Sequence, residues 1–163
     1  MKTKTINALM LCTVIGLTGT LTTQAADPSD SQRVQGRYLV EIAGCNDCHT
    51  PGYAPSGGKV PESQWLIGDQ LGFRGPWGTT YPINLRTYIG SLSEDEWVAK
   101  AKSLQARPPM PSWALSAMKE TDLRALYAFV KSLGPSDNKV PAYVPPNEQP
   151  MPPVIQWPSP EGQ

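Results

Sequence analysis

The sequence predicts an all-α domain of three to five helices, followed by a proline-rich C-terminal extension. Apolar residues recur at helical spacing in three segments, and no segment alternates apolar and polar residues as a strand does. The chain has 163 residues, and nine of its 18 prolines fall in residues 135–163. Because residues 1–25 have the features of an export signal, residues 26–135 remain for one small domain, and residues 136–163 form the extension.

Residues 1–25 follow the layout of a secretory signal peptide. Lys2 and Lys4 precede an apolar run, and small residues end the segment at Ala25. The run is short for a bilayer span, and the alternative to cleavage is an anchor helix. We therefore predict export to the periplasm, with no membrane span after cleavage. Cys12 lies inside the run and would be lost with the signal.

The charge balance argues against a nucleic-acid partner. The whole chain has a formal net charge of zero. Cleavage after Ala25 removes two lysines and no acidic residue, so the charge falls from zero to −2. A protein that binds nucleic acid usually carries a strongly basic surface instead.

The first predicted helix begins at the helix-starting residues Ser29 to Ser31 and ends at Gly44. Its apolar residues recur at helical spacing and are Val34, Tyr38, Leu39 and Ile42. This helix leads the chain directly into Cys45.

Two further helices are predicted toward the C-terminus of the domain. One begins at Ser93, where Ser93 and Glu96 are spaced as a capping box, and it places Trp97, Val98, Ala101 and Leu104 on one face. The other runs from about Glu120 to Leu133, with an apolar stripe formed by Leu123, Leu126, Tyr127, Val130 and Leu133. Gly134 and Pro135 end it.

The five residues from Cys45 to His49 match the C-x-x-C-H pattern of covalent haem c attachment. Two thiols one helical turn apart can each form a thioether with a vinyl group on one edge of a porphyrin. His49 would then place one imidazole nitrogen on the iron as the proximal ligand. Its other nitrogen should donate a hydrogen bond to a backbone carbonyl, and we expect that carbonyl between Thr50 and Pro61.

Three other interpretations of the motif compete with haem attachment. A thioredoxin-like redox pair needs a βαβ setting, and no strand is predicted before Cys45. A structural zinc site needs four ligands, but His49 is the only histidine, and Cys45 and Cys48 are the only cysteines after residue 25. A disulfide is the default for a close cysteine pair after export, but it would leave His49 unexplained.

The single histidine also limits the second axial ligand of the iron. Two histidines on one iron are impossible within one chain, so the ligand is a methionine, a rarer residue such as lysine, or absent. After residue 25 the methionines are Met110, Met118 and Met151. We predict Met110, because the flanking prolines hold it in an extended loop, with Met118 as the alternative. A His/Met pair suits electron transfer more than oxygen activation.

Several further side chains are candidates for packing against the haem. Residues 50–90 are rich in glycine and proline and carry scattered aromatics, which can cover a flat ligand. The candidates are Trp77, Tyr81, Asn84, Trp113 and Met118. Packing in the protein core is the alternative for each aromatic side chain, and core filling is the alternative for each methionine.

The order of these features resembles the class I c-type cytochromes, which are small electron carriers with one haem. The resemblance rests on Gly36-Arg37-Tyr38 before the motif, on Met110 in its proline loop, and on the segment Asp122 to Val130. It implies a cytochrome c-like fold, in which the first and last helices cross near Gly36, with aromatics such as Tyr38, Tyr127 or Phe129 at the crossing.

A narrower resemblance is to the haem domains in the cytochrome subunits of bacterial alcohol and aldehyde dehydrogenases. It rests on Cys45 to Gly52, Tyr81 to Leu85, Ser93 to Trp97 and Pro109 to Leu133. Those subunits usually carry three haem motifs, whereas this chain has one. In them a serine often caps the last helix, and Lys119 stands at that position here, which predicts a start delayed to Thr121.

The leading functional hypothesis is a periplasmic cytochrome c with one covalent haem c. It would carry single electrons between a redox protein donor, such as a dehydrogenase, and an acceptor, without being an enzyme itself. One alternative is a haem oxidoreductase with a displaceable sixth ligand. The other is a haem subunit docked in a larger redox complex, where the extension could strap onto its own domain or onto a partner through Val140, Tyr143, Val144, Ile155 and Trp157.

Overall fold

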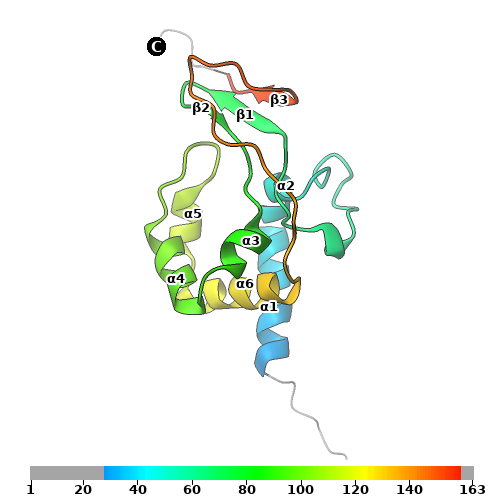
Figure 1. Cartoon of the computed structure of the whole chain (residues 1–163). Helices are drawn as coiled ribbons and strands as arrows, with labels where there is room; N and C mark the ends of the chain where they lie inside the picture. Colours follow the sequence, from blue (N-terminus) through cyan, green and yellow to red (C-terminus); the bar gives the residue numbers. More distant parts are fainter. Residues whose placement is uncertain (1–27, 159–163) are drawn as a thin grey trace, which may run out of the picture.

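The computed structural model describes residues 28–158, which form six α-helices and a small sheet (Figure 1). The helices are α1 (Pro28–Ile42), α2 (Cys45–His49), α3 (Leu85–Gly90), α4 (Glu94–Ser103), α5 (Ser112–Ala117) and α6 (Glu120–Ser132), with a 3-10 turn at Glu62–Gln64. The strands are β1 (Gly72–Gly75), β2 (Gly78–Thr80) and β3 (Val154–Gln156). The predicted signal segment lies outside the described residues.

The prediction of an all-α fold is wrong, because the fold also contains a three-stranded mixed sheet. Its strand order is β2-β1-β3, with β1 antiparallel to β2 and parallel to β3. The hairpin strands have only four and three residues. Such strands are too short to show an alternating pattern, and their glycines indicate a loop. The third strand comes from the extension, more than 70 residues further along the chain. No local sequence pattern could therefore predict its pairing with β1.

The helical core is built around the crossing of α1 and α6 (Figure 1). At Gly36 an added Cβ would lie 2.0 Å from the Ala125 carbonyl oxygen and 2.7 Å from the Phe129 Cβ, so the two backbones touch. Phe129 is fully buried at this crossing, as the resemblance implied. The rest of the core is apolar and comprises Leu39, Val40, Trp65, Leu66, Ile89, Trp97, Ala101, Leu115, Leu123, Ala125, Leu126 and Val130.

Part of the apolar pattern expected for α1 faces away from this core. Val34 is 62% exposed, Tyr38 53% and Ile42 60%, whereas Leu39 and Val40 are buried. Gly36 lies on the packed face, because a Cβ added there would collide with the backbone of α6. Of the three aromatics expected as alternatives for the crossing, Phe129 lies there, whereas Tyr38 is half-exposed.

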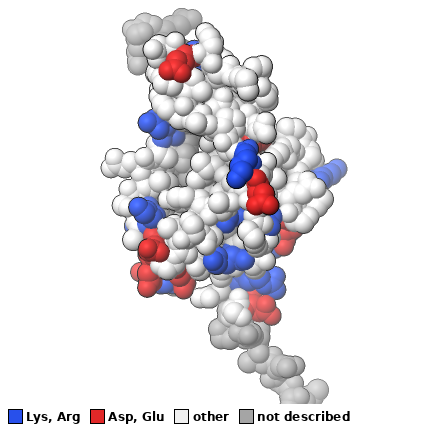
Figure 2. All heavy atoms as spheres, viewed as in Figure 1, with Lys and Arg blue, Asp and Glu red and all other residues white. Residues whose placement is uncertain are grey.

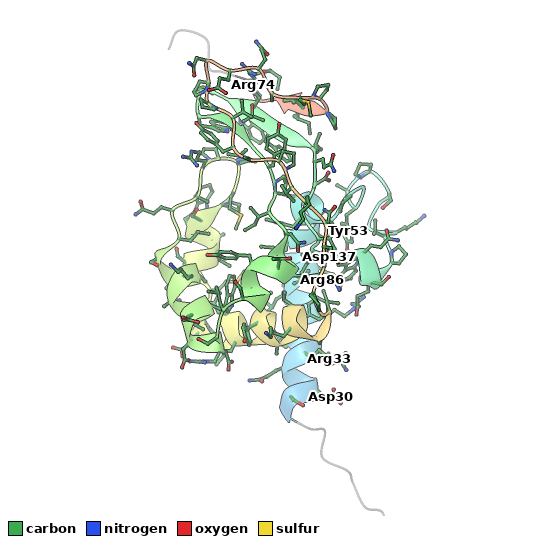
Figure 3. All side chains as sticks on the ribbon, viewed as in Figure 1. Asp30, Arg33, Tyr53, Arg74, Arg86 and Asp137 are labelled. Carbon is green, nitrogen blue, oxygen red and sulfur yellow. The ribbon has the colours of Figure 1, made fainter. Side chains whose placement is uncertain are left out.

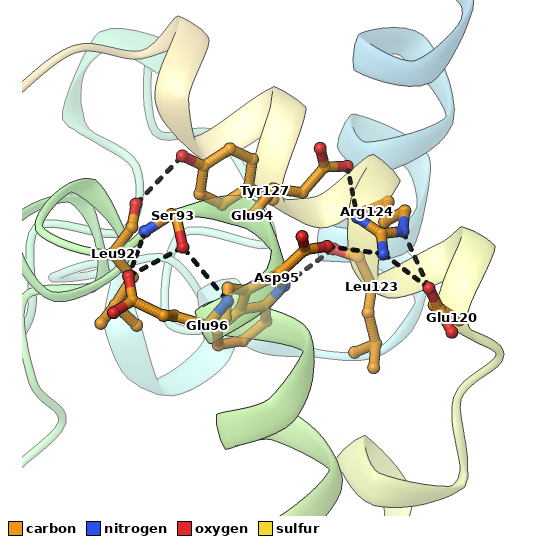
Figure 4. A network of polar contacts seen from close by, with 10 residues as sticks. Leu92, Ser93, Glu94, Asp95, Glu96, Glu120, Leu123, Arg124 and Tyr127 are labelled. Atoms are coloured by element: carbon orange, nitrogen blue, oxygen red, sulfur yellow. Dashed lines mark hydrogen bonds and ion pairs between the residues drawn. The ribbon is translucent and has the colours of Figure 1, made fainter.

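Polar contacts join the start of α4 to α6 (Figure 4). The predicted capping box is confirmed, because Ser93 and Glu96 exchange hydrogen bonds at the first turn of α4. On α6, Arg124 forms ion pairs with Asp95 at 2.8 Å and Glu120 at 2.6 Å. The indole of Trp97 donates to the Leu123 carbonyl oxygen over 2.7 Å. α6 begins at Glu120, one residue before the delayed start expected from Lys119.

The C-terminal extension packs against its own domain. It first pairs with the outer edge of β2, where Thr79 and Val144 form a bridge. It then crosses the hairpin and pairs with the outer edge of β1 as β3. The ring of Trp157 lies 6.2 Å from the ring of Trp77, and the Tyr143 hydroxyl donates to the Trp77 carbonyl oxygen over 2.8 Å. The extension therefore covers both edges of the β1–β2 hairpin.

Arg74 holds the crossing segment of the extension (Figure 3). Its guanidinium donates to the carbonyl oxygens of Glu148 and Pro146 over 3.1 and 3.3 Å. We expect Arg74→Ala to loosen residues 145–150 locally, and limited proteolysis should cleave this stretch several-fold faster than in the parent protein. Arg33→Ala is the control, because Arg33 pairs with Asp30 on exposed α1. Equal cleavage rates in both variants would contradict this role.

The surface shown in Figure 2 has no large patch of a single charge sign. Acidic and basic side chains are intermixed around the lower part of the face in Figure 2, and its upper part near the sheet carries few charges. Among residues 28–158, no helix is both long and apolar enough to cross a bilayer.

Candidate functional site

The C-x-x-C-H motif forms its own short helix at the end of α1. Gly44 has φ of 69°, a left-handed conformation that suits glycine and turns the chain from α1 into α2. α2 then spans Cys45 to His49 in little more than one turn. The two cysteines therefore lie about one turn apart on a single helix, as the motif requires.

Both thiols are free and partly buried. Burial raises the pKa of Cys45 to about 11, and nearby Asp47 and Cys48 act in the same direction. Burial also raises the pKa of Cys48, with smaller contributions from Asp47 and Asp69. Disulfide formation proceeds through the thiolate. The raised pKa values keep both thiols mainly protonated at neutral pH, which slows their oxidation to a disulfide.

The His49 ring is buried and anchored at one nitrogen. Its Nδ1 lies 2.8 Å from the carbonyl oxygen of Ile83, so the neutral ring donates there. A backbone-carbonyl partner was expected, but between Thr50 and Pro61, and that location is wrong. Burial lowers the pKa of His49, while the hydrogen bond to Ile83 opposes the shift. Within residues 28–158 no hydrogen bond engages Nε2, so the ring presents a neutral nitrogen suited to a metal.

A loop from Trp65 to Asp69 fixes the backbone on both sides of this histidine. The Gly68 N–H donates to the His49 carbonyl oxygen over 2.8 Å. The Leu66 N–H donates to the Thr50 hydroxyl, which itself donates to the Asn46 side-chain oxygen over 2.7 Å. The other side of the loop is bonded to residues 82–85, because the Asp69 N–H donates to the Pro82 carbonyl oxygen. The end of α2 and the Ile83 carbonyl are thus connected through a single short loop.

Met110 lies in the loop between α4 and α5. The Thr80 hydroxyl of β2 donates to the Pro108 carbonyl oxygen over 2.8 Å, which ties this loop to the hairpin. Met110 is partly buried and packs against the core, and so does Met118 at the end of α5. Met110 as an iron ligand stays a prediction, with Met118 as its alternative.

The remaining candidates occupy different environments. Trp77, in the hairpin turn, is partly buried against Trp157, and its indole nitrogen is buried without a hydrogen-bond partner. Tyr81 is partly buried after β2, and Trp113 on α5 is 74% exposed. Asn84 caps α3 by accepting from the Thr87 N–H, and its amide donates to the extension. Asn84 therefore already has a scaffold role.

The motif residues suit a covalently attached haem by the chemistry of their donor atoms. They offer two free thiols on one turn and a buried neutral imidazole whose Nδ1 is fixed. Among the described residues, no group of three or more His, Cys, Asp or Glu side chains is placed to hold a metal ion. No family model, curated protein or solved structure matches this chain.

Sequence reasoning missed the residues that support His49. Ile83 contributes a backbone carbonyl, which every residue type possesses, so its identity carries no signal. The sequence indicates Asn84 only as a packing candidate, and no pattern points to Asn138. The sequence signal for Asn84 was its position as a helix-capping residue before Leu85.

Proposed function

We propose that this protein is a monohaem cytochrome c that carries single electrons from a redox protein donor, such as a dehydrogenase, to an acceptor. One observation carries the proposal: α2 presents two free thiols beside a buried, neutral histidine whose Nδ1 is held by the Ile83 carbonyl. A bound haem iron would supply the one-electron chemistry by cycling between its ferrous and ferric states.

The roles of the protein residues follow from their environments. The Cys45 and Cys48 thiols would each add across a haem vinyl group, with the sulfur bonded to one carbon and the hydrogen to the other. His49 would bind the iron through Nε2, and the bond from its Nδ1–H to Ile83 would fix the ring and strengthen its electron donation. Met110 would be the second protein ligand of the iron, which favours electron transfer over binding of a small substrate.

Export to the periplasm belongs to the same proposal and rests on residues 1–25. The extension supports an intramolecular role more than a tether to another protein. Its aromatic residues Tyr143 and Trp157 contact Trp77 of their own domain. We therefore favour a freely diffusing carrier over a subunit that docks through this segment.

Spectra of Met110→Ala test the proposal. The purified parent protein should carry one covalent haem and show the methionine-to-iron charge-transfer band when oxidised. Met110→Ala should keep the haem, lose that band and bind carbon monoxide when reduced, because the sixth position opens. Met118→Leu is the matched control and should retain the band.

Two results would count against this assignment. A parent protein without covalent haem would refute the proposed function altogether. Covalent haem without the charge-transfer band, together with rapid carbon monoxide binding in the parent protein, would favour the oxidoreductase with a displaceable ligand.

A further inference from the structure

The extension packs tightly at Gly68 against the residues that hold the proximal histidine. The Gly68 N–H donates to the His49 carbonyl oxygen over 2.8 Å. An added Cβ at Gly68 would lie 2.8 Å from the Ile83 carbonyl carbon and 2.7 Å from the Asn84 nitrogen. The same Cβ would lie 2.5 Å from a methyl group of Val140, which belongs to the extension. Gly68 is therefore packed between the backbone of His49, the carbonyl that His49 binds, and the extension.

Two asparagine side chains connect the extension to this point. The Asn138 amide donates to the carbonyl oxygen of Ile67 over 2.8 Å and to that of Gly68 over 3.3 Å. In the opposite direction, the Asn84 amide donates to the carbonyl oxygens of Ser136 and Asn138 over 3.0 and 3.1 Å. The Asn84 side-chain oxygen accepts from the Thr87 N–H and caps α3. These bonds link residues 67–68, residues 83–84 and residues 136–138 into one closed network.

The path of the extension into this network is also fixed. Arg86 of α3 donates to the carbonyl oxygens of Leu133, Gly134 and Pro135, where the chain leaves α6 (Figure 3). Burial lowers the pKa of this guanidinium, and its carbonyl partners satisfy its donors. These bonds fix the backbone of residues 133–135, which leads the chain to Asn138 beside the Gly68 loop.

We propose that Asn138 and Asn84 are positioning residues that hold the Ile83 carbonyl against His49 Nδ1, so that the C-terminal extension sets the electron donation of the proximal ligand. This inference rests on the proposed haem function. It gives residues 136–140 a functional role within the domain, although they follow the last helix and lie outside the predicted core.

The physical link is the strength of one hydrogen bond. A strong bond from Nδ1–H to a carbonyl makes the imidazole a better electron donor and stabilises the ferric state. If the Ile83 carbonyl moves away, that stabilisation weakens and the reduction potential rises. Asn84 and Asn138 carry no charge, so neutral substitutions change the geometry of the network without adding a charge near the iron.

The network has room for substitution. A cavity of about 820 Å³ lies over it and is lined by Ile83, Asn84, Asn138 and Val140 among others. A smaller side chain at position 138 therefore removes hydrogen bonds without creating a sealed void in the core. Asn84→Ser keeps a helix-capping oxygen but is too short to reach the extension.

The test compares holoproteins of the full chain by reduction potential and by the NMR resonance of the His49 Nδ1–H in the ferrous state. In Asn138→Ala and in Asn84→Ser, the reduction potential should rise by up to about 59 mV. For one electron this corresponds to about a tenfold change in the redox equilibrium constant. The Nδ1–H should also shift upfield and exchange faster with solvent. Asn147→Ala is the control, since Asn147 is exposed on the same extension, and it should match the parent protein.

The reduction potentials and Nδ1–H resonances of the two asparagine variants decide whether the extension positions the Ile83 carbonyl. A raised potential with an altered Nδ1–H in either asparagine variant supports it, even if the other variant does not fold. Variants that are less stable but keep the parent potential and resonance overturn it and leave a purely structural role. A parent protein without covalent haem would instead refute the proposed function, which separates the two failures.

Discussion

Without both thiols, the protein is expected to carry no covalent haem. In the Cys45→Ala, Cys48→Ala double variant neither vinyl group has a sulfur partner, and the denatured chain should show no haem on a gel stained for haem. Each single variant should retain one thioether at most, and the unreacted vinyl group should shift the visible band of the reduced, denatured haem. Haem per chain should therefore fall from one to near zero in the double variant.

Cys12→Ala is the matched control for this experiment. Cys12 is the only other cysteine of the chain and lies in the predicted signal segment, so its loss should not change haem content. Covalent haem in the double variant would contradict the assignment, and so would a disulfide between Cys45 and Cys48 in the exported parent protein. The raised thiol pKa values argue against the disulfide, because they keep the reactive thiolate scarce at neutral pH.

The long helices could be predicted because their signals are local. The capping box at Ser93 and Glu96 fixes the start of α4, and the stripe from Leu123 to Val130 defines α6. The helices α3 and α5 have six residues each, which is too few for a repeating pattern. Short helices depend on tertiary contacts, such as those between Arg86 of α3 and the end of α6.

The sheet and the histidine support could not be predicted, because they depend on distant contacts. β3 pairs with β1 through Ile155 and Phe73, far apart in the sequence. The Gly68 loop contacts both the His49 backbone and residues 83–84, and the Ile83 carbonyl bonds to the His49 ring. The motif itself was readable because its chemistry requires fixed spacing within five residues. Sequence thus identifies the candidate ligand, whereas only the fold reveals what orients it.

A single methyl group at the α1–α6 crossing is expected to destabilise the whole domain. In Gly36→Ala the new Cβ would lie 2.0 Å from the Ala125 carbonyl oxygen, which belongs to helix backbone and cannot rotate away. Alanine would gain about 1 kcal/mol of helix propensity over glycine. Overpacking costs about 1–3 kcal/mol or more, and backbone contact favours the upper end of that range.

The free energy of unfolding of Gly36→Ala should therefore fall by about 1–2 kcal/mol. Each kcal/mol should lower the melting temperature by roughly 4–8 °C in a domain near 100 residues. Urea and thermal unfolding of the holoprotein measure it. Gly90→Ala is the control, because no atom lies within 4 Å of a Cβ added at this position in α3, and helix propensity alone should leave that variant equal or more stable. If Gly36→Ala unfolds at the same urea concentration as the parent protein, the close contact between α1 and α6 at Gly36 does not stabilise the domain.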